Sequence, residues 1–148
     1  MDIRQLYQEL IIDHSRRPRN CCALACASCQ AQGFNPLCGD KLTVFVKLEN
    51  NRIKEAAFQG SGCAICIASA SLMTEHLKDK TLEEAEEIFQ AFHQLVIGKP
   101  AGADSPSLGK LMVLGGVSEF PSRVKCATLA WHTLHAALQK DHEPVTTE

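Results

Sequence analysis

The stretch NPLCGDKLTVFVKLENN, residues 35–51, joins a turn to a strand and predicts how the fold is organised. Apolar residues alternate with mostly polar neighbours over its second half, at Leu42, Val44, Val46 and Leu48. An alternation of period two is typical of a strand that buries one face. We therefore expect a strand over residues 41–49, entered directly from the turn.

The turn before this strand carries residues that a change of chain direction does not require. Asn35, Pro36 and Gly39 are typical turn residues. A turn does not need a thiol, however, and Cys38 lies two positions before a carboxylate, Asp40. This pairing suggests that the turn has a chemical role.

The other expected elements are one further strand and four helices. The second strand, over residues 53–59, follows turn-forming residues and makes a hairpin with the first. Helices are indicated by apolar residues at helical spacing, by small residues that pack closely and by a capping box that begins at Thr81. Their expected ranges are 2–15, 63–77, 81–96 and 122–138. Residues 21–33 are interpreted as a loop or a ragged strand, and residues 98–121 as a connector with one short helical turn.

These elements predict an α+β fold, a small three-stranded antiparallel sheet with helices packed on it. We expect residues 1–140 to form this single domain and residues 141–148 to form a polar C-terminal tail. A chain of 148 residues is long enough to bury a sizeable core without disulfides.

Composition and charge exclude several classes of function. The net charge is −2 and the basic residues are scattered, so neither nucleic acid nor a membrane is expected as a partner. The N-terminal segment lacks the apolar core of a signal peptide, and no apolar run approaches the ~18 residues of a membrane span. We expect a cytoplasmic protein, in which eight cysteines indicate metal binding or thiol chemistry rather than disulfides.

Three cysteines lie at the ends of expected elements. Cys38 precedes the first strand of the hairpin, Cys63 follows the second at the start of a helix, and Cys126 lies in the first turns of the last helix. Helix N-termini lower the pKa of nearby thiols, which favours thiolate. Hairpin ends lie side by side, so Cys38, Asp40 and Cys63 are expected to converge. With Cys126 they provide three sulfurs and one carboxylate, an acceptable tetrahedral set for Zn²⁺.

Three motifs carry a resemblance to a known family: NPLCGD (35–40), GSGCAICIASASLM (60–73) and FPSRVKCATLAW (120–131). They resemble, in order, the cysteine motifs of the iron–sulfur cluster assembly U-type proteins, the IscU/NifU-like family, over roughly residues 1–140. The chain is most similar to the SufU-type members. It shares their long segment before the last cysteine, and Lys125 stands where ISC-type scaffolds carry a histidine ligand.

The resemblance implies a tightly held zinc ion bound by Cys38, Asp40, Cys63 and Cys126. It also implies that Cys38 accepts persulfide sulfur from a pyridoxal-phosphate cysteine desulfurase of the SufS-like type, which would make the protein a zinc-dependent sulfurtransferase. Arg123 is the implied contact with the desulfurase. Downstream SUF scaffold proteins would then receive the sulfur.

Three alternatives remain open from the sequence. The same three cysteines could hold a transient [2Fe–2S] cluster, and the protein would then be a scaffold. Cys63 and Cys66 form a C-x-x-C at a helix start, as in dithiol oxidoreductases, although no βαβ pattern precedes it. A closed structural zinc module would leave the Asp40 ligand unexplained.

The remaining cysteines and three of the histidines are interpreted as structural or incidental. Cys66 is expected to be a small buried residue. Four thiols near the N-terminus belong to no motif of the family and are interpreted as incidental loop thiols, although the last three have a conceivable metal-ligand spacing: Cys21, Cys22, Cys26 and Cys29. The histidines interpreted as structural or surface groups rather than ligands are His14, His132 and His135.

Overall fold

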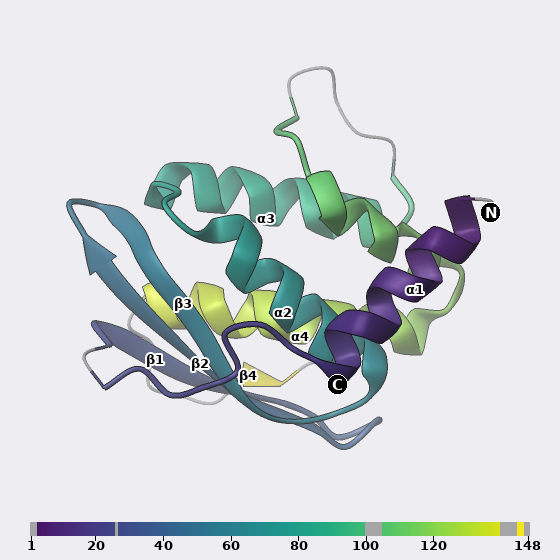
Figure 1. Cartoon of the computed structure of the whole chain (residues 1–148), viewed down its shortest axis with the longest axis horizontal. Coiled ribbons are helices and arrows are strands. Elements are labelled where there is room, and N and C mark those ends of the chain that lie inside the picture. The colour runs from purple at the N-terminus through teal and green to yellow at the C-terminus, as the bar shows by residue number, and fades with distance from the viewer. Residues whose placement is uncertain (1–2, 26, 100–104, 140–144, 147–148) are drawn as a thin grey trace.

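One sheet and the helices that cover one of its faces make up the fold (Figure 1). The structure, a computed structural model, describes residues 3–25, 27–99, 105–139 and 145–146. The strands are β1 (Cys29–Asn35), β2 (Asp40–Glu49), β3 (Arg52–Ser61) and β4 (Val145–Thr146). The helices are α1 (Ile3–Arg16), α2 (Ala64–Leu77), α3 (Leu82–Val96), the 3₁₀ helix η1 (Gly109–Glu119) and α4 (Pro121–Leu138). The expected α+β fold is confirmed.

The sheet has the strand order β3-β2-β1-β4. β1, β2 and β3 are joined by two consecutive hairpins and are antiparallel, as expected. β4 adds a short fourth strand, which pairs in parallel with β1 through Gly33 and Phe34. β4 lies within the expected C-terminal tail, where no strand was predicted, and β1 lies within residues 21–35, most of which are expected from sequence to form a loop or a ragged strand.

The register of the two hairpins brings distant residues to one end of the sheet. Asn35 pairs with Asp40, so the turn of residues 36–39 closes the β1–β2 hairpin. Lys41 pairs with Ser61, so the end of β3 lies beside the start of β2. The segment that leads from β3 into α2 is therefore adjacent to Asp40. This register is the reason why Cys38, Asp40 and Cys63 lie near one another.

The core lies between the sheet and α2 and α4. The inward residues of β2, Leu42, Val44 and Val46, are fully buried, as their alternation predicts. Trp131 of α4 stacks on Phe92 of α3 with ring centroids 4.5 Å apart. The helices α2 and α4 are also joined by polar contacts. Trp131 Nε1 donates a hydrogen bond to Ser69 Oγ (3.2 Å), and Ser69 Oγ donates to the carbonyl of Ala127 (2.6 Å).

The helix α4 lies close against β1. A Cβ atom at Gly33 would collide with the side chain of Thr133, so only glycine permits this approach of strand to helix. The contact fixes α4 over the end of the sheet that carries the β1–β2 turn. It thereby helps to place Cys126 above that turn.

The segment before α4 is more regular than expected. In place of one short turn, η1 is a 3₁₀ helix of eleven residues. Buried residues recur at every third position from the N-cap Leu108 through Leu111, Leu114 and Val117, which is the period of a 3₁₀ helix, and Val113 is buried as well. The glycines and prolines of this segment are typical of connectors, so the sequence did not predict a helix of this length.

The capping box expected at Thr81 is present. The Thr81 hydroxyl accepts a hydrogen bond from the Glu84 amide (3.1 Å), and the Glu84 carboxylate accepts one from the Thr81 amide (3.0 Å). This reciprocal pair satisfies two amides that the start of α3 would otherwise leave unpaired. No helix among the described residues is long and apolar enough to cross a bilayer.

A buried histidine ties α1 to α2. His14 is 1% exposed, and its Nδ1 lies 2.7 Å from Ser71 Oγ. The same hydroxyl accepts a hydrogen bond from the Arg19 amide (2.8 Å), which anchors the chain as it leaves α1. Burial, reinforced by the positive charge of Arg19, lowers the pKa of His14. His14 is thus the structural residue that the sequence predicted.

The lowered pKa of His14 predicts a pH dependence of stability. In the unfolded chain the His14 imidazole binds a proton near pH 6.5, whereas in the folded protein it binds one only at a lower pH. The unfolded state is therefore favoured as the pH falls below 6.5, and the free energy of unfolding decreases. We expect the free energy of unfolding to fall less between pH 7 and 5 in His14→Gln than in the unsubstituted protein. The slopes of the free energy of unfolding against pH should differ between the two proteins by at most about 1.4 kcal/mol per pH unit. Urea unfolding at several pH values, with chelator in both samples, measures this, and equal slopes would rule out His14 as the cause.

Candidate metal centre

Three potential ligands meet at the end of the sheet that carries the β1–β2 turn. One ligand atom each from Cys38, Asp40 and Cys126 lies within 4.8 Å of the others. Cys126 Sγ is 3.2 Å from Cys38 Sγ and donates a hydrogen bond to it. Among the described residues, this is the one group of three or more cysteine, histidine or acidic side chains with such a spacing. The turn, the first residue of β2 and α4 supply one ligand each.

The β1–β2 turn presents Cys38 to solvent. The Cys38 amide donates to the carbonyl of Asn35 (3.3 Å), and Gly39 has a φ of +72°, in the left-handed region that glycine adopts without strain. Cys38 is exposed, whereas Asp40 and Cys126 are 2% and 1% exposed. One thiol of the centre is therefore open to a partner, and the other two groups are enclosed.

Asp40 is held by hydrogen bonds to both of its carboxylate oxygens. Oδ1 accepts from the backbone amide of Cys63 (2.9 Å), and Oδ2 accepts from Asn35 Nδ2 (3.1 Å). Among the described residues, no lysine, arginine or histidine forms an ion pair with this carboxylate. A buried carboxylate of this kind calls for a positive charge nearby, because an unpaired buried charge is costly.

Cys63 borders this group from the start of α2. It is the N-cap of the helix, and its Sγ accepts a hydrogen bond from the Cys66 amide (3.4 Å). Its backbone amide is the donor to Asp40, and its side chain interacts with that of Cys126. Its thiol is not within the tight group of three ligand atoms, but the residue is in contact with two of them.

The environment of Cys126 differs from the one expected from its position in α4. We expected the helix N-terminus to lower its pKa. Instead, burial raises the pKa of the Cys126 thiol, and interactions with Cys38, Cys63 and Asp40 raise it further. Cys126 is the sixth residue of α4 and lies beyond the first turn, where the amides and the helix dipole act most strongly.

Asn35, expected from sequence only as a turn residue, belongs to the centre. Its side chain is fully buried, and its Nδ2 donates both to Asp40 Oδ2 and to Cys126 Sγ (3.4 Å). Its Oδ1 is buried and has no hydrogen-bond partner among the described residues. Asn35 therefore orients two ligands at once. The pairing of Asn35 with Asp40 across a four-residue turn would have indicated this role. That pairing can be recognised only when the register of β1 is known.

The donor set fits a zinc ion. Two thiols and a carboxylate converge, a third thiol borders them, and the buried Asp40 has no cationic partner among the described residues. In a tetrahedral site with Zn–S bonds of about 2.3 Å, neighbouring sulfurs lie about 3.8 Å apart. The 3.2 Å between Cys38 and Cys126 would open by a small amount on binding. A bound cation would also reverse the effect of this acidic cluster on the thiols.

The other cysteines fall into two groups. Cys66 is fully buried, and burial, together with the charges of Asp40, Cys63 and Cys38, raises the pKa of its thiol. Of the N-terminal thiols, Cys21 and Cys22 are exposed and Cys29 begins β1, whereas Cys26 lies outside the described residues. None of the three described thiols joins a group of potential metal ligands.

Arg123 lies in the first turn of α4, three positions before Cys126, and is exposed. Its guanidinium is 4.4 Å from the ring centroid of Phe120, which is itself 45% exposed. Among the described residues, Arg123 forms no ion pair with Asp40. Its position on an open surface near the centre is compatible with a contact to a partner.

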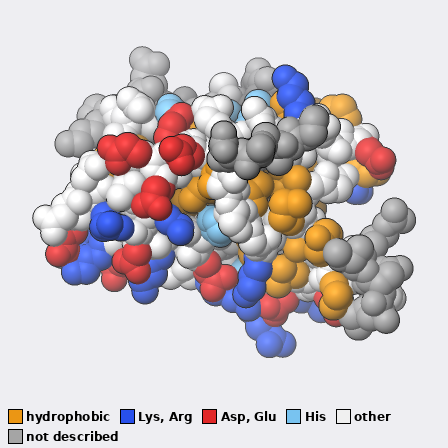
Figure 2. Space-filling model, turned by 90° about the horizontal axis from the view of Figure 1, so that it is seen from above, with side chains coloured by type: hydrophobic (Ala, Val, Ile, Leu, Met, Phe, Trp, Pro, Cys, Tyr) orange, Lys and Arg blue, Asp and Glu red, His pale blue; other side chains and the backbone are white. Residues whose placement is uncertain are grey.

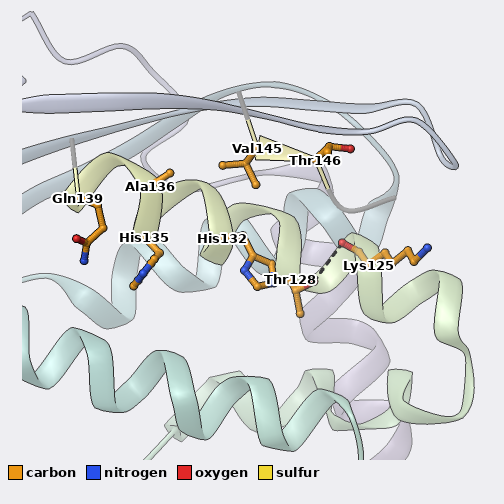
Figure 3. Close-up of a pocket in the computed structure, with 8 residues that line it drawn as sticks. All are labelled: Lys125, Thr128, His132, His135, Ala136, Gln139, Val145 and Thr146. Atoms are coloured by element: carbon orange, nitrogen blue, oxygen red, sulfur yellow. Dashed lines mark hydrogen bonds between the residues drawn. The ribbon is translucent and has the colours of Figure 1, made fainter. Parts of the chain in front are cut away.

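A separate groove of about 650 Å³ runs along α4 and is bordered by β4 (Figure 3). His132 and His135 line it, with Lys125 at one end and Gln139 at the other. Both histidines also pack edge-on against Phe89, with ring centroids 5.3 Å away. In the described part of the chain they join no group of potential metal ligands.

Acidic and basic side chains are interspersed on the face of the molecule that Figure 2 shows, and they form no large patch of one sign there. Apolar side chains gather near the middle of the same view.

Two known proteins are similar to this chain over most of its length. The chain is 40% identical over 136 residues to the zinc-dependent sulfurtransferase SufU of Bacillus subtilis strain 168, which covers 92% of this chain and 91% of the relative. It is 38% identical over 138 residues to the iron–sulfur cluster assembly scaffold protein IscU of Streptococcus pyogenes serotype M1, with coverages of 93% and 86%.

A solved structure shares the fold. FiSufU of Fervidobacterium islandicum AW-1, a candidate scaffold protein for the SUF system, superposes with a TM-score of 0.83 at 32% identity, covering 93% of this chain and 99% of that one. The profile of the NifU-like N terminal domain family matches residues 6–127. The chain is therefore a member of this family of iron–sulfur cluster assembly proteins.

Proposed function

We propose that the protein is a zinc-bound sulfur acceptor in iron–sulfur cluster biogenesis. Zinc would be held by Cys38, Asp40, Cys63 and Cys126, and a pyridoxal-phosphate cysteine desulfurase of the SufS-like type would supply the sulfur. The observation that carries the proposal is the unequal exposure of the centre. Cys38 is open to solvent on a turn, while Asp40 and Cys126 are almost fully buried.

The exposed position of Cys38 suits a thiol that must meet a partner's persulfide. Bound zinc would keep the thiols deprotonated, but a metal-bound thiolate is a weaker nucleophile than a free one. Cys38 would therefore react as a thiolate that is not bound to the metal. Cys38 lies on a turn of four residues, which can move with less disruption than the helix α4 that carries Cys126 or the strand β2 that begins with Asp40.

The transfer itself is a thiol–disulfide type of exchange. The free Cys38 thiolate attacks the outer sulfur of the desulfurase persulfide, a new S–S bond forms at Cys38, and the desulfurase cysteine leaves as a thiolate. No external oxidant is required, because the transferred sulfur carries its oxidation state with it. Downstream SUF scaffold proteins would accept this sulfur from Cys38.

Arg123 is proposed as a contact to the desulfurase. It is exposed near the start of α4, and its stacking on Phe120 holds the guanidinium at the surface. A planar guanidinium binds carboxylates of a partner in a bidentate manner.

A scaffold for a [2Fe–2S] cluster is the second candidate. The similarity to a scaffold protein of Streptococcus pyogenes, at 38% identity, favours it. Lys125 weighs against it. This residue stands next to Cys126, where we expected a scaffold to carry a histidine ligand, and an ammonium group is a poor ligand for iron.

Loading with zinc or with iron distinguishes the two candidates. Zinc-loaded protein is expected to increase alanine formation from L-cysteine by a SufS-type desulfurase in the presence of a reductant. If zinc-loaded protein gives no increase, while iron-reconstituted protein assembles a [2Fe–2S] cluster and donates it to an apo-ferredoxin, the protein is a scaffold and the proposal is wrong.

A further inference from the structure

Two large apolar side chains lie exposed on the elements that carry the two neighbouring thiols of the centre. Leu37, which is 64% exposed, immediately precedes Cys38 on the β1–β2 turn. Phe120, which is 45% exposed, comes directly before α4, six residues or about 9 Å of helix axis ahead of Cys126. The turn and α4 meet where the sulfurs of the two cysteines are 3.2 Å apart. We call Leu37 and Phe120 the apolar rim of the centre.

The β1–β2 turn holds Leu37 in a fixed position at the surface. The Cys38 amide donates to the carbonyl of Asn35 (3.3 Å), so Leu37 is the third residue of a four-residue turn and follows Pro36. The ring of Pro36 fixes its own φ, which leaves the turn little freedom. Polar residues are typical of such a turn, and Leu37 belongs neither to the hydrophobic core nor to the residues packed on it. The fold therefore does not require a leucine here.

Phe120 occupies a helix position that favours a polar residue. It is the N-cap of α4, where serine, threonine, aspartate or asparagine would accept a hydrogen bond from the first amides of the helix. No side chain makes such a bond at this helix start. Like Leu37, Phe120 lies outside the core, and its ring contacts Arg123 instead. The helix thus begins with a residue that stabilises it less than a polar one would.

Both rim residues conflict with their local structure, and conflicts of this kind are expected at functional sites. Their common feature is their place beside the exposed thiol of Cys38. A protein that brings a sulfur atom to Cys38 has to cover the neighbouring residue, so the burial of Leu37 follows from the contact that the transfer requires. Aromatic and apolar side chains buried at the middle of an interface supply most of its affinity.

We propose that the apolar rim is the contact by which the cysteine desulfurase docks, and that Leu37 and Phe120 set the affinity of this complex. The proposal rests on the function proposed above and adds the residues that recognise the sulfur donor. The donor's surface around its persulfide cysteine would be apolar, with a carboxylate in reach of Arg123. A rigid turn loses little conformational entropy on docking, which favours binding. A small persulfide would bury neither rim residue, so the rim selects a protein donor.

The concentration of zinc-loaded protein that gives half-maximal stimulation of a SufS-type desulfurase tests the rim. Leu37→Asn introduces a typical turn residue and removes the apolar surface, and Phe120→Ser introduces a typical N-cap. Each is expected to raise the half-maximal concentration about tenfold. The maximal stimulation is fitted separately, so that lost affinity is distinguished from lost reactivity. Leu6→Gln is the matched control, because Leu6 is a 51% exposed leucine on α1, which supplies none of the proposed ligands. It should leave the half-maximal concentration unchanged.

The melting temperature is a readout that a purely structural role would move in the opposite direction. Because serine caps a helix and phenylalanine does not, Phe120→Ser should melt at the same temperature or higher and keep its zinc, although it docks more weakly. A lower melting temperature would assign Phe120 a structural role and remove it from the rim.

Isothermal titration calorimetry with the desulfurase, in the absence of L-cysteine, measures docking without turnover. If Leu37→Asn and Phe120→Ser bind as tightly as the unsubstituted protein, or if Leu6→Gln loses as much affinity as they do, the rim is not the docking contact. The proposed function would fail differently, through a lack of stimulation by the unsubstituted zinc-loaded protein.

Discussion

Substitution of Cys38 by serine is expected to abolish the stimulation of the desulfurase while the fold survives. Serine keeps the size of the side chain but cannot carry a persulfide. Cys38 lies on an exposed turn outside the hydrophobic core, so the substitution removes no buried apolar contact. Alanine formation by the desulfurase should therefore fall to the rate of the desulfurase alone.

Cys22→Ser is the matched control, because Cys22 is also an exposed cysteine and lies outside the group of potential ligands. It should stimulate the desulfurase as the unsubstituted protein does. Mass spectrometry after a short reaction locates the persulfide, which we expect on a peptide that contains Cys38. Undiminished stimulation by Cys38→Ser, or a persulfide found at another cysteine, would assign the acceptor role elsewhere.

The part of the centre that could be predicted is the part fixed by local pattern. The alternation from Leu42 to Leu48 defined β2, and the turn residues after it defined the β2–β3 hairpin. Once β2 and β3 pair in register, Lys41 lies opposite Ser61, and the residues just outside this pair are neighbours by necessity. The proximity of Asp40 and Cys63 was for this reason predictable without any knowledge of the helices.

The part that could not be predicted depends on contacts between distant segments. β1 is short of β-branched residues, and its Gly33 is there because α4 approaches the strand closely at Thr133. The same packing buries Cys126, which raises the pKa of its thiol instead of lowering it. The local spacing of residues predicts neither the burial of Cys126 nor the close approach of α4 to β1.

Asn35 shows how such contacts give a residue a second role. In sequence it is a turn former, but with β1 and α4 in place its amide reaches ligands from two elements, Asp40 and Cys126. A residue that orients ligands can be recognised only after the ligands have been placed.

The largest expected loss of metal follows from removing two of the three proposed sulfur ligands together, in the double variant Cys63→Ser/Cys126→Ser. Only Cys38 and Asp40 would be left of the four proposed ligands, and two ligands do not hold zinc against competition. Zinc content after dialysis against a chelator should fall from about one per chain to near zero. Elemental analysis of both proteins, prepared side by side, measures it.

The same variant should lose the stability that zinc supplies. Free zinc at about 1,000 times its dissociation constant stabilises the folded state by about 4 kcal/mol, which corresponds to a rise in melting temperature on the order of 10 °C for a chain of this size. The unsubstituted protein should show this rise on addition of zinc, and the variant should not. Melting of both proteins with chelator present separates this effect from the packing cost of changing Cys126, which is a buried residue of α4. Full zinc occupancy in the double variant, or an unchanged response of its melting temperature to zinc, would show that the metal is bound elsewhere in the chain.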